Sequence, residues 1–274
     1  MKSKLFIITL LALLVIGCTR DPLPEPEREG GKIVTISATI PPETRVLYDD
    51  TDLSLTWQTG DTLLLAGYDG TTYKGSEKFH WTGGNSFQGT DVPGANIYKA
   101  YYLVEGITLN ETTGEVQLPD NFWEQIQNGN NSTAHLRNHL LLFDEQAHPI
   151  NQIFNLVAKS SIIKLNLSGI PQEVGALRKL IYTVETVPGV FKSVPLNVTD
   201  VTFSAALDNI TAFLSFDPAV MTNIAAGGKV TIRLGGDKLY QWSRSVTDGK
   251  EYAAGNRYTG AVSSGWADIT TPLY

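Results

Sequence analysis

Short runs in which apolar and polar residues alternate recur along this chain, and they constrain its fold more than any other feature. Such runs lie at residues 34–40, 63–66, 97–104, 162–167, 180–184, 211–216, 230–234 and 239–246. Because side chains on a strand point alternately to opposite faces, each run predicts a strand with one buried face. Turn signals such as Asp69-Gly70, Pro188-Gly189 and Asp248-Gly249 separate the runs. This spacing is typical of antiparallel β-sandwiches, so the predicted fold class is all-β.

Helical patterns are weak in this sequence. Residues 121–128 could form two turns, and residues 151–159 have a partly helical pattern, so each predicts a short helical element at most. The Asn-, Gly-, Ser- and Thr-rich stretch 128–137 is the best internal break. It predicts a boundary near residue 145, with one β-sandwich over residues 32–145 and a second over 146–274.

The first residues have the pattern of an export signal. Lys2 and Lys4 precede an apolar stretch over residues 5–16, which is too short to span a bilayer of about 30 Å. It ends at Val15-Ile16-Gly17-Cys18, the residue order that lipoprotein signal peptidases accept. We therefore predict a signal peptide over residues 1–17 and lipid on Cys18. Two or more acyl chains on this residue would anchor the protein stably to a membrane. The alternative is an ordinary secretory cleavage that leaves Cys18 as a stray thiol.

Charge and cysteine content exclude several classes of function. Removal of residues 1–17 takes away two lysines and no acidic residue, so the formal charge changes from -7 to -9. An acidic protein is repelled by nucleic acid and by anionic lipid, so membrane contact is expected through the lipid only. Cys18 is the single cysteine, which excludes disulfides and thiol catalysis from the folded part. The acidic, proline-rich residues 18–31 predict an extended linker.

The sequence carries no pattern of known catalytic chemistry. It lacks a glycine-rich phosphate loop, a Gly-x-Ser-x-Gly elbow and a His-Glu-x-x-His pair, so we expect no enzyme and no cofactor. His135 and His139, with His148 nearby, could bind zinc, but the polar surroundings favour unrelated loop histidines without a helix. Asp49, Asp50, Asp52 and Glu43 could chelate calcium, yet they lack EF-hand spacing, and a solvated acidic loop is the preferred interpretation.

Aromatic residues and one tripeptide suggest two further surface functions. Tyr98, Tyr101 and Tyr102 in one strand, and Tyr240 and Trp242 in another, could form a glycan-binding platform. A sandwich core produces the same alternation and is the favoured interpretation. The tripeptide 61–63, Asp-Thr-Leu, matches the short acceptor sequence of Bacteroidales O-glycosylation, although its place at the start of a strand argues against occupancy.

Motifs in a particular order make the chain resemble a known family. They are the lipobox cysteine, the strand 32–40 followed by Pro-Pro-Glu-Thr-Arg at 41–45, Trp-Gln-Thr-Gly-Asp at 57–61 before an aliphatic strand, Ile-Ile-Lys-Leu-Asn-Leu at 162–167, and Tyr-Ala-Ala-Gly-Asn-Arg-Tyr at 252–258. Together they resemble the fimbrillins and fimbrillin-like (Mfa-like) surface lipoproteins of Bacteroidales, the subunits of type V pili. The resemblance extends over essentially the whole chain.

This resemblance implies a fold and an assembly mechanism. The implied fold is two transthyretin-like β-sandwich domains in tandem. In the implied mechanism, a trypsin-like protease cuts after an arginine just past the first strand. That strand leaves, and a strand from another subunit fills the groove by β-strand addition.

The first predicted strand has the composition that this mechanism requires. Val34, Ile36, Ala38 and Ile40 share one face, and burial of three large aliphatic side chains stabilises the strand by about 5–9 kcal/mol. Loss of the strand would expose a template for β-strand addition. Arg45 follows two prolines, which cannot continue a central strand, and it is the candidate processing site. An uncut loop arginine is the alternative, and a cut at Arg28 would only release the lipid.

These observations lead to a hypothesis of function. We expect a fimbrillin-like structural or adhesion subunit of a cell-surface pilus, without enzymatic activity, at the outer membrane and cell surface. Its expected partners are other pilus subunits, together with host or bacterial surface ligands. If the first strand is never released, the protein would be a basal anchor or accessory subunit. A surface glycan-binding lipoprotein is the alternative from another class.

Overall fold

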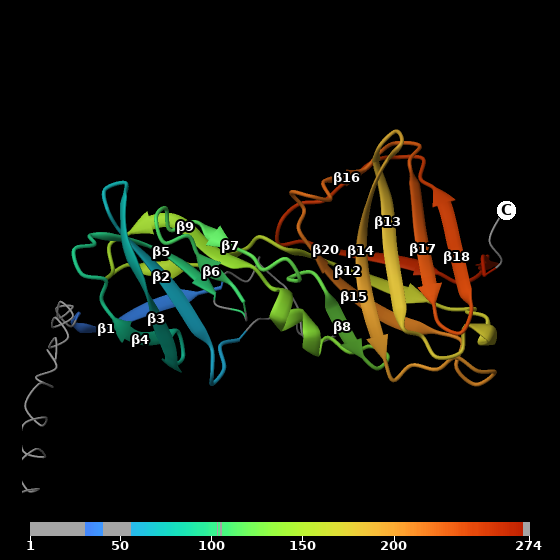
Figure 1. The fold of residues 1–274 in the computed structure, drawn as a ribbon, viewed down its shortest axis with the longest axis horizontal. Helices are drawn as coiled ribbons and strands as arrows, with labels where there is room; N and C mark the ends of the chain where they lie inside the picture. Colours follow the sequence, from blue (N-terminus) through green and yellow to red (C-terminus); the bar gives the residue numbers. More distant parts are fainter. Residues whose placement is uncertain (1–30, 41–55, 103, 105, 271–274) are drawn as a thin grey trace, which may run out of the picture. The chain divides into compact units, whose positions relative to one another are not determined.

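The structure is a computed structural model that describes residues 31–40, 56–102, 104 and 106–270 (Figure 1). Cys18, Arg28 and Arg45 lie outside the described residues, as do the signal peptide and the acidic residues 49, 50 and 52. Residues Lys32–Tyr274 form one unit. Within the described ranges, no helix has both the length and the apolar character needed to cross a bilayer.

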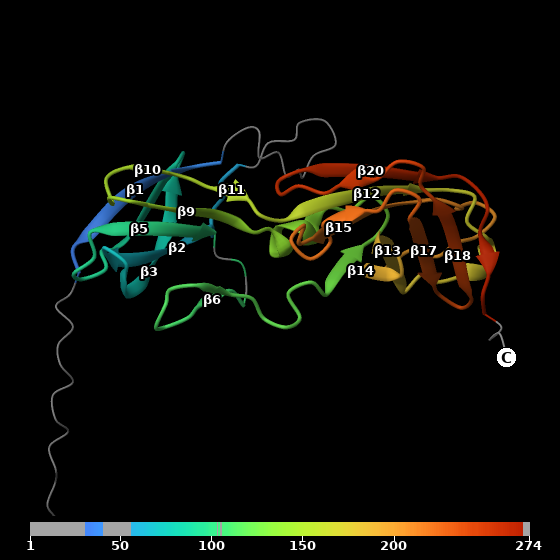
Figure 2. The same ribbon diagram turned by 90° about the horizontal axis from the view of Figure 1, so that it is seen from above.

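The first sheet has eight strands in the order β10-β1-β4-β3-β2-β5-β9-β11. These are β1 (Ile33–Thr39), β2 (Thr62–Asp69), β3 (Thr72–Gly83), β4 (Ser86–Thr90), β5 (Ile97–Tyr102), β9 (Leu142–His148), β10 (Ile153–Asn155) and β11 (Val157–Ala158). The two end strands, β10 and β11, follow each other directly in the chain (Figure 2). The sheet therefore curls around its own core, in which Leu63, Leu65, Phe79 and Phe87 are fully buried.

The second core lies between a six-stranded sheet, β21-β18-β17-β13-β14-β8, and a three-stranded sheet, β15-β12-β20. Their strands are β8 (Gln125–Asn128), β12 (Ser161–Leu167), β13 (Lys179–Val187), β14 (Val190–Thr199), β15 (Ile210–Phe216), β17 (Lys229–Gly235), β18 (Leu239–Ser245), β20 (Arg257–Val262) and β21 (Ala267–Asp268). Leu165, Leu180, Leu196 and Leu214 are among its fully buried residues. Two packed layers around one core make this part a β-sandwich.

Short elements complete the described chain. They are the strands β6 (Thr108–Leu109), β7 (Val116–Gln117), β16 (Asn223–Ile224) and β19 (Lys250–Glu251), and the 3-10 helices η1 (Ala134–His139) and η2 (Gln172–Val174). The strands pair as β6 with β7 and β16 with β19.

The all-β prediction is confirmed. Each alternating run in the sequence lies on a strand, namely β1, β2, β5, β12, β13, β15, β17 or β18. On β13, for example, Leu180, Tyr182 and Val184 are buried, whereas Ile181 and Thr183 between them are partly exposed. The transthyretin-like detail of the two domains stays a prediction.

Both helical predictions are wrong. Residues 125–128 form β8, which pairs in parallel with β14, and residues 153–158 form β10 and β11. Pairing with distant strands overrides the weak local pattern in both segments. The histidine segment also differs, because Ala134–His139 form the 3-10 helix η1 where no helix was expected.

The predicted boundary near residue 145 falls inside β9. Strand β8 precedes it in the chain but pairs in the six-stranded sheet, and β10 and β11 follow it but belong to the first sheet. After Ala158 the chain enters β12 of the three-stranded sheet. The chain therefore enters the six-stranded sheet once before β9, and it leaves the first sheet for the last time after Ala158.

Candidate functional site

The candidate site is the seat of β1, by which we mean the groove between β4 and β10 that β1 fills. β1 runs antiparallel to β4, with Ile36 opposite Phe87, and parallel to β10, with Ala38 opposite Phe154. Ile36 and Ala38 are buried, and Val34 and Ile40 are partly buried against the same core. The four residues predicted for the exchangeable strand thus face the core together. Removal of β1 would leave a groove with a strand on each side.

Backbone hydrogen bonds fasten the C-terminal end of β1 on both sides. The Ala38 amide donates to the Asn85 carbonyl at 2.8 Å, and the Leu156 amide donates to the Thr39 carbonyl at 2.9 Å. The Thr39 hydroxyl also donates to the Asn155 amide oxygen at 2.6 Å. The seat therefore offers polar partners as well as an apolar surface.

Trp57 covers the same end of β1. Its indole Nε1–H donates to the Ala38 carbonyl at 3.0 Å. Its ring meets Phe87 edge to face at 4.9 Å between centroids and lies 5.9 Å from the ring of Tyr102. The sequence predicted a core tryptophan followed by a turn, and the structure adds a direct hydrogen bond to the first strand.

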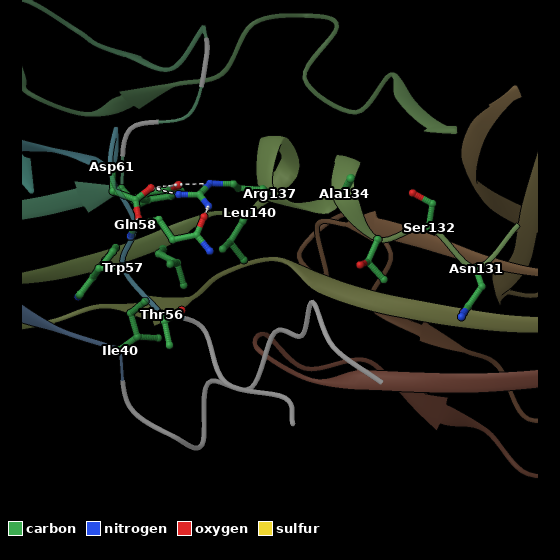
Figure 3. Close-up of a pocket in the computed structure, with 13 residues that line it drawn as sticks. Ile40, Thr56, Trp57, Gln58, Asp61, Asn131, Ser132, Ala134, Arg137 and Leu140 are labelled. Carbon is green, nitrogen blue, oxygen red and sulfur yellow. Dashed lines mark hydrogen bonds and ion pairs between the residues drawn. The ribbon is translucent and has the colours of Figure 1, made fainter. Parts of the chain in front are cut away.

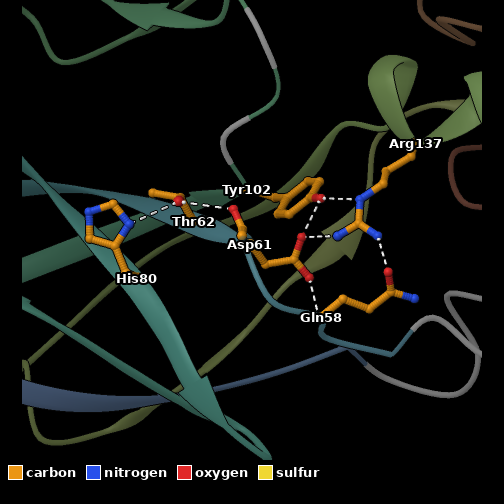
Figure 4. Close-up of polar contacts among 7 residues, drawn as sticks. Gln58, Asp61, Thr62, His80, Tyr102 and Arg137 are labelled. Atoms are coloured by element: carbon orange, nitrogen blue, oxygen red, sulfur yellow. Dashed lines mark hydrogen bonds and ion pairs between the residues drawn. The ribbon is translucent and has the colours of Figure 1, made fainter.

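A buried carboxylate holds the turn that follows Trp57 (Figure 4). Asp61 is 4% exposed. Its Oδ2 accepts from the Gln58 amide at 2.7 Å, and its Oδ1 accepts from the Tyr102 hydroxyl at 2.8 Å and from Arg137 Nη2. Arg137 also donates from Nη1 to Gln58 Oε1 at 2.8 Å and from Nε to the Tyr102 hydroxyl at 3.1 Å. Asp61 and Arg137 therefore form an ion pair in which each side chain makes several hydrogen bonds.

The environment of Tyr102 fixes its role in this network. Burial, and then its hydrogen bond to the Asp61 carboxylate, raise the pKa of Tyr102 to about 12. The hydroxyl therefore stays protonated near neutral pH. It donates to Asp61 while it accepts from Arg137.

A cavity of about 480 Å³ adjoins the end of β1 (Figure 3). Its wall includes Ile40, Trp57, Gln58, Arg137 and Leu140. Apolar side chains therefore lie beside the polar groups of the Asp61 network at this point.

The histidines considered for zinc have separate partners. His135 Nε2–H donates to the Phe213 carbonyl at 2.9 Å, His139 Nδ1–H donates to the Phe122 carbonyl, and His148 Nε2 lies 3.3 Å from Asp144 Oδ2. Across the part of the chain that the structure describes, no three His, Cys, Asp or Glu residues gather as a metal site. Burial lowers the pKa of His135 to about 4 and also lowers that of His139.

The aromatic residues considered for glycan binding belong to the cores. Tyr98, Tyr101, Tyr102 and Tyr240 are buried, and Trp242 packs against the second core. The platform interpretation is therefore wrong for these residues, and the core interpretation holds. At the glycosylation tripeptide, the Thr62 hydroxyl lies 3.2 Å from His80 Nδ1 and Asp61 is buried.

Two buried glutamines were missed by sequence reasoning. Gln125 and Gln127 of β8 are both 0% exposed. Gln125 accepts from the Ser215 amide at 2.6 Å and donates to the Ser215 carbonyl at 2.7 Å. Gln127 accepts from the Phe213 amide and donates to the Thr211 carbonyl, each at 2.9 Å. Their side chains thus bond the edge of β15 as a neighbouring strand would. The spacing Gln-Ile-Gln was the one local signal.

Comparisons with known proteins find similarity in solved structures alone. No protein-family model matches the chain, and no curated protein matches it. A candidate cell-adhesion protein from Bacteroides ovatus is 14% identical, with a TM-score of 0.49, over 88% of this chain and 96% of that one. A fimbrial assembly protein from Parabacteroides distasonis is 11% identical, with a TM-score of 0.37, over 87% and 96%.

A third similar structure is a fimbrial protein from Bacteroides ovatus. It is 15% identical with a TM-score of 0.36, and the match covers 85% of this chain and 48% of that one.

Proposed function

We propose that this protein is an adhesion-type subunit of a cell-surface pilus, anchored as a precursor by lipid on Cys18. In this role, a cut after Arg45 frees β1, and a strand of another subunit takes its seat. The partners are other pilus subunits, and the location is the outer membrane and then the fimbrium. The protein performs no catalysis.

The observation that carries the proposal is the position of β1 within its sheet. β1 is the N-terminal strand of the described chain, yet it lies inside the sheet, with β4 on one side and β10 on the other. The segment that connects β1 to β2 includes Arg45, so one cut there ends the covalent link between β1 and the strands that follow it. A strand from another chain could then form ladders on both sides, which is the geometry of β-strand addition.

The energetics of β1 also suit exchange. Burial of the Ile36 side chain alone contributes about 1.5–3 kcal/mol, and the alternating apolar face continues through Val34, Ala38 and Ile40. A vacated seat would expose this apolar surface and two rows of backbone groups. Because unpaired sheet edges associate readily, an empty seat favours capture of a new strand.

Protease treatment of a soluble form that begins at Thr19 tests the proposal. We expect a trypsin-like protease to give Val46 as the new N-terminus, together with oligomers that survive an unboiled gel and dissociate on heating. The N-terminus is followed by mass spectrometry and assembly by the gel.

Two matched variants separate the cleavage sites. Arg45→Gln should remain monomeric, whereas Arg28→Gln should still assemble because its cut would only shorten the linker. Cut protein that stays monomeric would remove the polymerising role and leave that of an anchor or accessory subunit.

A further inference from the structure

The contacts of Trp57 concentrate on the point where β1 ends. Its indole N–H binds the carbonyl of Ala38, two residues before the end of the described segment 31–40. Its ring also packs on Phe87, the residue opposite Ile36 on β4. For β1 to leave its seat, the Trp57 hydrogen bond must break. Trp57 therefore acts on the strand as well as on the core.

The position of Trp57 depends on Asp61. The Gln58 amide donates to Asp61 Oδ2 at 2.7 Å, and the Asp61 amide donates to the Gln58 carbonyl at 3.0 Å. These two bonds close the turn directly after Trp57. Because the Asp61 carboxylate is buried, the closed turn requires a counter-charge.

Arg137 supplies that counter-charge from a distant part of the chain. It lies on η1, 76 residues from Asp61, and its side chain is 35% exposed, whereas that of Asp61 is 3% exposed. η1 is itself fixed, because His135 donates to the Phe213 carbonyl at 2.9 Å and the Ser215 hydroxyl donates to the His139 carbonyl at 2.9 Å. Arg137 therefore contacts the turn from a helix that is itself held by hydrogen bonds to β15.

We propose that Trp57, Asp61 and Arg137 form a latch that sets how readily β1 leaves its seat. This inference rests on the proposed function, in which β1 must leave. All three are positioning residues, since Arg137 acts on β1 through Asp61 and the turn that carries Trp57. An intact latch keeps the precursor closed, and an opened latch releases the C-terminal end of β1 first.

Hydrogen exchange in the uncut soluble chain tests the latch without any assembly step. In Arg137→Gln, we expect the amides of a peptide covering β1 to exchange about tenfold faster than in the parent chain, because a hydrogen bond to a charged group is lost. Amides of β13 should keep their rates. The matched control is Arg178→Gln, which removes an exposed arginine that lies 2.8 Å from Asp237, and it should change neither strand.

A second variant tests the contact with β1 itself. Trp57→Phe keeps an aromatic ring but removes the N–H that binds Ala38, so β1 should again exchange faster. The double variant combines Arg137→Gln with Trp57→Phe. If the latch acts as a unit, this variant should raise the exchange rate of the β1 amides by less than the product of the two single increases. Equal acceleration of β1 and β13, or no difference between Arg137→Gln and Arg178→Gln, would overturn the proposal.

The outcome for the latch is separate from the outcome for strand exchange. Faster opening of β1 in the variants, together with cut protein that stays monomeric, would support the latch and refute exchange between subunits. Oligomers that form after cutting, with β1 opening unchanged in the variants, would refute the latch and support exchange.

Discussion

At the scale of single residues, the buried polar side chains carry the most specific information. The buried carboxylate of Asp61 meets Arg137, the Tyr102 hydroxyl and the Gln58 amide. His135 is buried with one ring nitrogen bonded to the Phe213 carbonyl, and its Nδ1 has no hydrogen-bond partner. Because an unpaired buried charge is costly, a change of charge at either site should lower the free energy of unfolding.

Asp61→Ala should strongly destabilise the protein. It leaves the Tyr102 hydroxyl and the Gln58 amide without their acceptor, and it removes the counter-charge of Arg137, which keeps Gln58 Oε1 and the Tyr102 hydroxyl as acceptors. We expect a loss of about 2–4 kcal/mol in the free energy of unfolding, measured by chemical denaturation, because two donors lose their acceptor in a buried site while Arg137 stays partly exposed to water. Asp237→Ala is the control, because it removes an exposed partner of Arg178 and should cost less than about 1 kcal/mol. Similar losses in the two variants would contradict the network.

His135 predicts a loss of stability in mild acid. Its pKa is about 4 in the folded state, below the usual 6.5, so the unfolded chain binds more protons between these values. The contribution of the neutral His135 ring to the free energy of unfolding is therefore fully present above pH 6.5 and is lost as the pH falls towards 4. Between pH 7 and pH 5 the free energy of unfolding should fall by about 2 kcal/mol from this residue.

Variants of two histidines isolate this effect. His135→Gln should lose most of the additional pH dependence between pH 7 and pH 5, as measured by denaturation at each pH. His80→Gln, at an exposed position, should keep it. An unchanged pH profile in His135→Gln would show that the buried ring is not its source.

At the scale of elements, β8 closes the second sandwich with both its backbone and its side chains. Its backbone pairs with β14 of the six-stranded sheet, while Gln125 and Gln127 bond β15 of the three-stranded sheet. One short strand thus joins the two layers at a corner. Ile126, between the two glutamines, is 54% exposed, so the usual preference for apolar core residues is reversed here.

Gln125→Ala should destabilise the protein although it removes a polar side chain. The Ser215 amide and carbonyl would lose their partner in a buried site, which predicts a loss of about 1–3 kcal/mol in the free energy of unfolding. Ile126→Ala in the same strand is the control, and we expect a smaller loss because the side chain is exposed. A larger loss in Ile126→Ala would contradict the role assigned to the glutamines.

At the scale of the whole molecule, the sequence predicted what depends on local periodicity. The alternating runs predicted eight of the strands and the core-facing side of β1, because burial of one face imposes a period of two. They missed β3 and β14, since Phe79 is the one buried residue of β3 and the first four residues of β14 are exposed. Strands such as β8, β10 and β11 are two to four residues long and too short to show a period. Arg137 was missed because its partner Asp61 is 76 residues away, and no local pattern encodes that contact.

Exchange of β1 between chains can be followed by native mass spectrometry of the protein cut after Arg45. We expect the segment 19–45 to leave and the remaining chains, residues 46–274, to appear as multiples of one mass. A single species with the segment 19–45 still bound to residues 46–274 would contradict it, because β1 would then be a permanent part of the fold.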